Sequence, residues 1–256
     1  MLSTGANAPL ETTIREYGPK PQSPTIVEGL PGLGSVGRLA VSFLIDESKA
    51  RKIAELYSPY FPYQAIVNSR GIARLPRAEF YYSTNNRREL MMMSGDCQPL
   101  TSYGQYEVAS KIVQYALKHS AAQIISIGGF VSPRRDRDLV VGAATSSSLV
   151  SKLTSAGASV EKGGVPIVGV AGLLIALART KKLNAACLLG QTFGLGPDPA
   201  AAQRVLRVLA KVLELKLDFS NLDRQVAKIR TVEKKIGQIE KRLASMLRKD
   251  RMIYIG

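Results

Sequence analysis

The segment of residues 25–44, TIVEGLPGLGSVGRLAVSFL, constrains the fold more than any other part of the chain. It opens with the apolar pair Ile26 and Val27, which predicts a buried strand, and it ends with apolar residues at helical spacing. A glycine-rich turn stands between them. A buried strand that turns directly into a helix is typical of α/β proteins, in which helices cover a central sheet.

The spacing Gly32-x-Gly34-x-x-Gly37 also matches the GxGxxG pattern, in which a helix N-terminus binds a phosphate. A dinucleotide site would add an acidic residue about 20 positions later, at the tip of the second strand. The second predicted strand, residues 52–57, carries Glu55 inside it rather than at its end. We therefore favour a structural role, in which glycines let a strand turn sharply into a closely packed helix.

Further short motifs follow in order along the chain. They are Gly95-Asp96-Cys97-Gln98-Pro99, Gly128-Gly129, Gly142-Ala143-Ala144-Thr145, IVGVAGLL at residues 167–174 and LLGQT at residues 188–192. Together with GLPGLGSVGRLA, they make the chain resemble the proteasome assembly chaperone family, and in particular the archaeal-type homologues of the eukaryotic proteasome assembly chaperone 2. The resemblance implies a three-layer α/β/α sandwich like that of purine nucleoside phosphorylases.

The resemblance also implies a non-enzymatic, homo-oligomeric chaperone that binds the α-subunits of the proteasome core particle. Four aromatic residues lie between Tyr57 and Tyr63, where the family has a strand-rich insert near subunit contacts. This segment resembles an interface patch, and a small satellite core under a loop is the equal alternative. Beyond it, residues 72–75 and 79–83 predict a hairpin that turns at Pro76.

A small-molecule-binding enzyme of the same fold is the alternative function, because fold does not fix function. Gly32, Gly34 and Asp96 fall where ligands of open sheets bind. Asp96 could hold a substrate hydroxyl or a metal, or it could cap the helix that starts near Ser102. The sequence contains no Walker motif and no base–nucleophile pair, and its single histidine, His119, stands at a helix end. We therefore expect no catalytic residue, no metal and no cofactor.

Changes in composition divide the chain into three parts. Residues 1–24 are polar and rich in proline, and they predict an arm with one edge strand at residues 12–17. Residues 25–217 alternate apolar strands with helices, which predicts a mostly parallel sheet between helices. Residues 218–256 predict a basic helix and tail, in which apolar residues at positions 229–246 recur at coiled-coil spacing.

The chain ends in Ile253, Tyr254, Ile255 and Gly256. The resemblance implies that Ile253, Tyr254 and Ile255 enter a pocket between α-subunits, as C-terminal hydrophobic-tyrosine tails do. A tyrosine offers rigid amphipathic contact area, and a terminal carboxylate can pair with a pocket lysine. Gly256 departs from the pattern, because it places Tyr254 third from the end rather than second. The alternative is an apolar terminal strand that packs on the domain.

The net charge of +15 suits nucleic acid or an acidic protein surface. We find no nucleic-acid-binding module and no tryptophan, so we do not expect a nucleic-acid partner. No apolar run reaches the roughly 18 residues of a membrane span, and no signal peptide is evident. Cys97 and Cys187 stand in apolar settings. We therefore expect a cytoplasmic protein with reduced cysteines.

Overall fold

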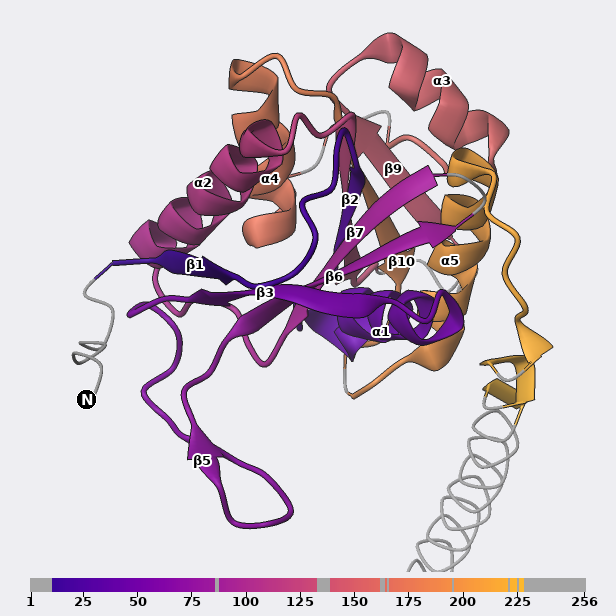
Figure 1. Cartoon of the computed structure of the whole chain (residues 1–256). Coiled ribbons are helices and arrows are strands. Elements are labelled where there is room, and N and C mark those ends of the chain that lie inside the picture. The colour runs from indigo at the N-terminus through magenta and orange to yellow at the C-terminus, as the bar shows by residue number, and fades with distance from the viewer. Residues whose placement is uncertain are drawn as a thin grey trace, which may run out of the picture. The chain divides into compact units, whose positions relative to one another are not determined.

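The computed structural model describes residues 11–85, 88–132, 139–161, 164, 166–194, 196–220, 222–224 and 226–227. The chain divides into two compact units, Met1–Leu217 and Asp218–Gly256. The fold described below is that of the first unit (Figure 1). Across the described residues, no helix is both long enough and apolar enough to cross a membrane.

An eight-stranded sheet forms the centre of the first unit, with the strand order β1-β3-β6-β7-β2-β8-β10-β9. Its strands are β1 Thr13–Glu16, β2 Thr25–Glu28, β3 Arg51–Tyr57, β6 Ala78–Asn85, β7 Arg88–Gly95, β8 Gln123–Phe130, β9 Val140–Ala144 and β10 Ala185–Gln191. A separate two-stranded sheet pairs β4 Ile66–Val67 with β5 Ala73–Arg74. The predicted edge strand of residues 12–17 is confirmed, because β1 lies at one end of the order and pairs with β3.

The sheet is parallel only at its centre, so the expectation of a mostly parallel sheet is wrong for both sides. β2 pairs in parallel with β7 and β8, and β8 pairs in parallel with β10. The pairs β1–β3, β3–β6, β6–β7 and β10–β9 are antiparallel. The reason is visible at β6 and β7, which are separated by a connection too short for the crossover that parallel strands need.

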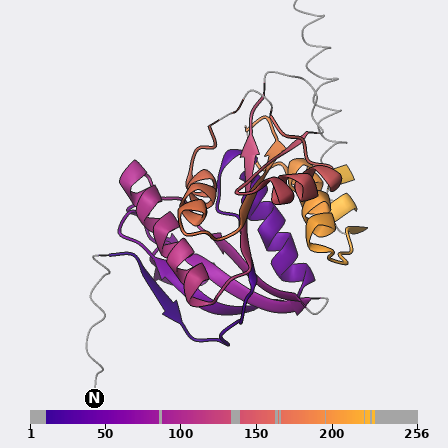
Figure 2. The same ribbon diagram turned by 90° about the horizontal axis from the view of Figure 1, so that it is seen from above.

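Helices cover both faces of the sheet, as Figure 2 shows from above. α2 (Ser102–Lys118) and α4 (Val170–Thr180) pack on one face. α1 (Val36–Glu47) and α5 (Pro199–Leu213) pack on the other, and the short α3 (Ser147–Ser155) lies beside β9. The predicted α/β sandwich is confirmed, while its likeness to purine nucleoside phosphorylases stays a prediction. The predicted coiled coil falls almost entirely outside the described residues.

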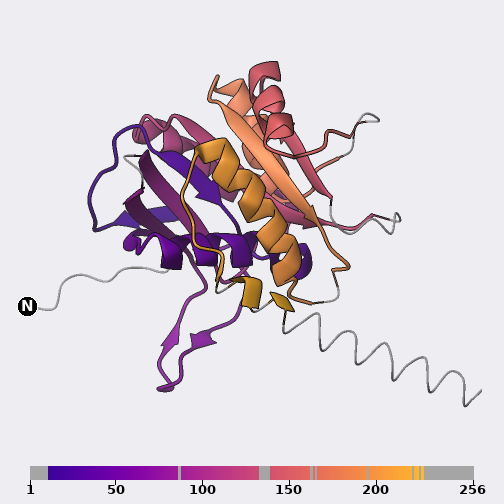
Figure 3. The same cartoon turned by 90° about the vertical axis from the view of Figure 1, so that its right-hand side faces the viewer.

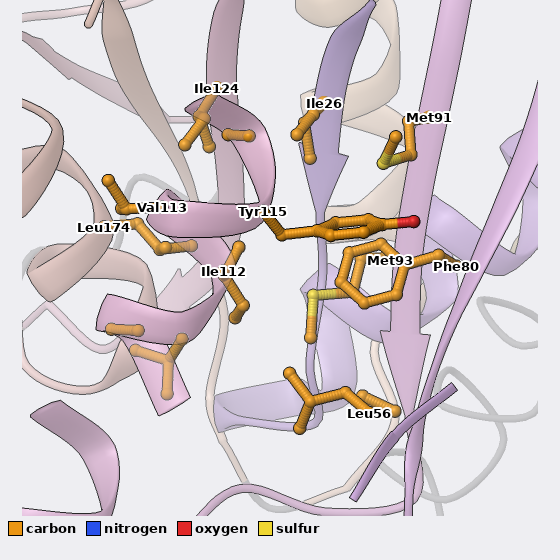
Figure 4. Packing of buried hydrophobic residues seen from close by; sticks show 14 of the residues in the cluster. Ile26, Leu56, Phe80, Met91, Met93, Ile112, Val113, Tyr115, Ile124 and Leu174 are labelled. Atoms are coloured by element: carbon orange, nitrogen blue, oxygen red, sulfur yellow. The ribbon is translucent and has the colours of Figure 1, made fainter. Parts of the chain in front are cut away.

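One part of the hydrophobic core lies between the sheet and the α2–α4 layer (Figure 4), and buried residues of α1 and α5 lie outside this part. Alternate residues of the strands point to this layer, so Ile26 of β2 and Ile124 of β8 meet Ile112 of α2 and Leu174 of α4. On the antiparallel side, Phe80 stacks at a tilt on Tyr115 of α2, with ring centroids 4.8 Å apart. Continuous apolar runs in the central strands are explained by burial on both faces.

Two predicted elements are absent where we expected them. Residues 72–75 do not pair with residues 79–83, because β5 pairs with β4 and β6 pairs with β3 and β7. The turn of the actual hairpin lies at Asn68–Gly71, where Gly71 supplies a φ of +77°. The apolar pair at residues 167 and 168, which opens the IVGVAGLL motif, predicts a strand, but it precedes α4 without sheet pairing.

Candidate functional site

The glycine-rich segment after β2 is packed backbone against backbone. A Cβ atom at Gly29 would overlap the carbonyl oxygen of Gly37, and a Cβ atom at Gly37 would overlap the carbonyl oxygen of Ile127 in β8. These contacts bring the first turn of α1 directly onto the loop and the central sheet. They account for glycine at position 37 through close packing alone.

The tip of the same loop is attached to the start of α5. Gly34 has a φ of +61°, and its carbonyl oxygen accepts a hydrogen bond of 2.8 Å from the amide of Asp198, the N-cap of α5. The Thr192 hydroxyl donates to the Asp198 carboxylate at 2.9 Å and lies against the Cα of Gly34. Side chains and backbone of a distant segment therefore hold the loop of residues 29–37, here called the glycine loop. Local sequence patterns do not reveal this contact, because Thr192 and Asp198 are more than 150 residues away from Gly34.

Gln98 joins three loops at the carboxyl ends of the strands. Its side-chain amide donates to the carbonyl oxygen of Pro31 at 2.6 Å, and its side-chain oxygen accepts from the amide of Val170 at 3.4 Å. Gly32 and Gly169 both lie so close to Gln98 that a Cβ atom would contact its amide group. The predicted loop residue Gly32 thus contacts Gln98, a residue of the GDCQP motif to which we had assigned no role.

Sequence reasoning also missed Glu28, a buried carboxyl group in the central strand. Glu28 is 1% exposed, and its Oε1 accepts a hydrogen bond of 2.8 Å from the amide of Leu30. Its Oε2 accepts no hydrogen bond from any described residue. Burial raises the pKa of Glu28 to about 7, although the Leu30 amide acts in the opposite direction. A charged residue that directly precedes the glycine turn was the available signal.

Glu28 belongs to a polar row that crosses the sheet. It is in register with Ser126 of β8, which is in register with Cys187 of β10. The Ser126 hydroxyl donates to the carbonyl oxygen of Ala171 in α4 at 3.0 Å. Burial raises the pKa of Cys187 to about 12, so this thiol stays protonated at neutral pH. Both cysteines are free, in agreement with the expectation of reduced thiols.

Asp96 neither caps a helix nor stands open to a ligand. Its carboxylate binds the Arg74 guanidinium through two hydrogen bonds of 2.6 and 2.9 Å, and it accepts the amide of Arg77 at 3.0 Å. Burial acts to raise the pKa of Asp96, but these donors outweigh it and lower the pKa below its ordinary value. The cap of α2 is Thr101, whose hydroxyl accepts from the amide of Gly104. Asp96 therefore anchors the segment that carries Arg74.

That segment, residues 58–77, is here called the projecting hairpin, and it extends away from the main sheet (Figure 3). Its turn is held by Asn68, whose side-chain oxygen accepts the amides of Arg70 and Ile72 at 3.0 Å each. Four large apolar side chains are more than half exposed, namely Tyr63, Val67, Ile72 and Leu75. The hairpin is thus well defined in its hydrogen bonding and apolar on its surface.

The aromatic residues of segment 57–63 differ in burial, and the role of this segment as an interface patch stays a prediction. Phe61 is buried in the hydrophobic core, whereas Tyr63 is fully exposed. Tyr60 packs edge-on against Tyr103 of α2, with ring centroids 5.3 Å apart. Beside this pair, Leu100, Tyr103 and Tyr106 are each more than half exposed. The foot of the projecting hairpin therefore continues into an apolar surface at the start of α2, here called the tyrosine patch (Tyr60, Leu100, Tyr103 and Tyr106).

A network of charges ties the C-terminal end of the projecting hairpin, at Arg77, to the sheet. Arg77 contacts Glu55 at 2.9 Å and Glu79 at 2.7 Å, and Lys52 contacts the same two carboxylates at 2.7 and 3.1 Å. Tyr81 donates to Glu79 at 2.7 Å. Burial opposes ionisation of Glu55 and Glu79, but their donors outweigh it and lower both pKa values. The network is thus a structural tie between β3, β6 and the projecting hairpin.

His119 is buried at the end of α2 and has two acceptors. Its Nδ1 lies 3.1 Å from the carbonyl oxygen of Pro21, and its Nε2 lies 3.0 Å from Glu16 in β1. Burial acts to raise the pKa of Glu16, but hydrogen bonds from Lys118 and His119 outweigh it and lower the pKa to about 2. His119 therefore ties the N-terminal segment to α2. Among the described residues, no group of three His, Cys, Asp or Glu side chains could hold a metal ion.

The predicted partner-binding residues Ile253, Tyr254 and Ile255 lie outside the described residues. The charged loop at residues 133–138 lies outside the described residues as well. The sites that the structure does describe are the glycine loop, the buried Glu28 row and the projecting hairpin with the tyrosine patch. The projecting hairpin and the tyrosine patch present most of the large exposed side chains among these sites, and the glycine loop exposes Leu33.

Comparisons with known proteins agree with this architecture. The crystal structure of Pyrococcus furiosus PbaB, described as an archaeal proteasome activator, matches with a TM-score of 0.81 and 37% identity over 89% of this chain and 99% of that chain. Pyrococcus furiosus PbaA, described as an archaeal homologue of proteasome-assembly chaperone, matches with a TM-score of 0.74 and 28% identity over 94% of this chain and 99% of that chain.

An uncharacterised protein of Methanocaldococcus jannaschii is 33% identical over 219 residues, which are 85% of this chain and 84% of that protein. The model of the PAC2 family matches residues 26–236, and so it covers the glycine loop, the projecting hairpin and every helix of the sandwich. The chain belongs to the PAC2 family.

Proposed function

We propose that this protein is a non-enzymatic, homo-oligomeric and cytoplasmic chaperone that binds the α-subunits of the proteasome core particle during assembly. The observation that carries the proposal is the likeness to PbaB and PbaA, which extends over almost the whole length of both proteins. The geometry supports a binding role rather than catalysis. The glycine loop is filled by packed backbone, and Asp96 is engaged by Arg74.

The proposed contact to the core particle includes the C-terminal tail. Ile253, Tyr254 and Ile255 supply two branched apolar side chains and a tyrosine, and Gly256 follows them. Such a segment can fill an apolar pocket on the partner. The pocket must also accept the glycine that follows Ile255.

Activation of the mature core particle is a second candidate function. The likeness to PbaB, described as an activator, is greater in identity and in TM-score than the likeness to PbaA. The two functions differ in the state of the partner. An assembly chaperone binds free α-subunits, whereas an activator binds the finished particle and opens it to substrates.

The experiment mixes the full-length protein with purified α-subunits, and separately with mature core particle, and it measures complex formation by size-exclusion chromatography. Assembly predicts co-elution with free α-subunits, and activation predicts faster peptide hydrolysis by the mature particle. A variant that lacks residues 253–256 should bind at least tenfold more weakly, which corresponds to about 1.4 kcal/mol. Unchanged binding of this variant would remove the tail from the mechanism.

A further inference from the structure

The projecting hairpin exposes apolar side chains on a framework too small to stabilise itself. β4 and β5 contribute two residues each, and an isolated hairpin of this kind is marginal in water. Nevertheless Tyr63 is 100% exposed and Ile72 is 61% exposed. Large apolar side chains gathered on a projection, rather than scattered singly, mark an interaction site.

The hairpin owes its conformation to polar anchors at both ends. Asn68 closes the turn through two backbone amides, and at the base the Asp96 carboxylate grips Arg74 with two hydrogen bonds. Arg77 adds the ion pairs to Glu55 and Glu79. A loop held in this way loses little conformational entropy when it binds, which is the requirement for a preorganised docking element.

The projecting hairpin and the start of α2, taken together, have the composition of an interface core. Within residues 58–77 and 97–106 there are four tyrosines and three arginines, but no Lys, Asp or Glu. Interface cores are enriched in tyrosine and arginine and depleted of Lys, Asp and Glu. Tyr60 and Tyr103 are already fixed against each other, and so they present a rigid surface.

The charge of the projecting hairpin indicates which charged groups its partner carries. Arg74 and Arg77 are neutralised by carboxylates of the sheet, whereas Arg70, at the exposed turn, makes no ion pair with any described residue. In a two-fold contact between the hairpins of two copies, the two Arg70 side chains would bring like charges toward each other. Like charges oppose such an encounter, and carboxylates on a different protein favour it.

We propose that the projecting hairpin and the tyrosine patch dock into an apolar pocket, rimmed by carboxylates, on a protein other than this chain. This inference rests on the proposed function, in which that protein is an α-subunit of the core particle. Tyr63 and Ile72 fill the pocket, Arg70 pairs with its rim, and the C-terminal tail makes a separate contact.

The test measures binding of full-length variants to immobilised α-subunit by surface plasmon resonance. Replacing both Tyr63→Ser and Ile72→Ser should raise Kd at least tenfold, because both side chains lose their apolar contact. Arg70→Glu should slow association severalfold at low salt, and this effect should shrink at high salt. The control variants are Val168→Ser, which changes another exposed apolar residue, and Lys152→Glu, which makes the same change in net charge. Both should bind within twofold of the wild type.

The outcomes separate this inference from the proposed function. If the wild type binds the α-subunit and the double variant binds equally well, the hairpin inference is wrong and the proposed function stands. If the wild type does not bind at all, both fall. If the double variant instead loses an oligomeric state that the wild type has in light scattering, the hairpin binds a second copy and the inference is overturned. Equal melting temperatures of all variants establish that each is folded.

Discussion

Gly37 shows at the scale of one residue how the glycine-rich segment works. The residue lies in the first turn of α1, where its missing side chain leaves room for the carbonyl oxygen of Ile127. Any Cβ atom at this point would push α1 away from β8. The GxGxxG spacing, which suggested a phosphate site, is thus explained by the distance between a helix and a strand.

Gly37→Ala should lower the free energy of unfolding by about 1–3 kcal/mol, as overpacking does. This loss of stability is expected although helices favour alanine over glycine by about 1 kcal/mol. Urea denaturation measures it. Gly196→Ala is the control, because a Cβ atom at Gly196 meets nothing within 4 Å. If both variants are as stable as the wild type, the close packing of α1 is not what requires glycine.

Glu28 gives the protein a pH dependence that can be predicted in sign. Its pKa is about 7 in the folded state, whereas the ordinary pKa of an unburied glutamate carboxyl group is 4.5. The folded state therefore binds the proton more tightly than the unfolded state between these values. Stability should fall as the pH rises from about 4.5 to about 7 and stay constant above that range, so far as this group contributes.

Glu28→Gln should remove this part of the pH dependence, because glutamine keeps the acceptor for the Leu30 amide and carries no charge. The stability of the variant relative to wild type should rise as the pH is raised from 5 to 8. The gain should reach at most about 3 kcal/mol, because each unit of pKa shift corresponds to about 1.36 kcal/mol. Urea unfolding at the two pH values measures the difference. Glu161→Gln, at an exposed position, is the control. An identical pH slope in wild type and Glu28→Gln would show that Glu28 does not titrate in this range.

At the scale of elements, the conformation of the projecting hairpin depends on a residue of the main sheet that lies outside the hairpin. β5 carries Arg74, and the carboxylate that holds it follows β7, 22 residues later. Asp96→Asn keeps the shape of the side chain but removes its charge and one acceptor oxygen, so one hydrogen bond from Arg74 is lost and the other is weakened.

Hydrogen exchange of Asp96→Asn tests this dependence. The amides of β4 and β5 should exchange about tenfold faster, which corresponds to about 1.4 kcal/mol of lost local stability. The amides of α2 and β8 should keep their wild-type rates, because they belong to the hydrophobic core of the sandwich. Equal acceleration throughout the sheet would mean that Asp96 stabilises the whole domain rather than the hairpin.

The same elements show which parts of the structure the sequence determines locally. Helix α2 begins at Ser102, where the sequence predicts its start, because its apolar residues recur at helical spacing. The hairpin was placed wrongly, because its register depends on Asn68 and on the distant Asp96 rather than on apolar alternation. Glu28 was missed for a similar reason, since burial of a charged residue depends on neighbouring strands that the local pattern does not reveal.

At the scale of the whole molecule, a rigid α/β sandwich carries one apolar projection and a strongly basic charge. The glycine loop packs α1 against the sheet, and Asp96 anchors the projecting hairpin to it. Membership of the PAC2 family rests on residues 26–236, whereas the proposed tail contact depends on the last four residues of the chain. The two proposed contacts are therefore separable by mutation.

The most direct test of the account is the mass, by light scattering after size-exclusion chromatography, of the full-length protein mixed with purified core-particle α-subunits. The account predicts a new species that contains both proteins and that forms without nucleotide, metal or other cofactor. Separate elution of the two proteins at concentrations of about 10 μM, well above the roughly micromolar Kd of even a weak specific complex, would contradict it.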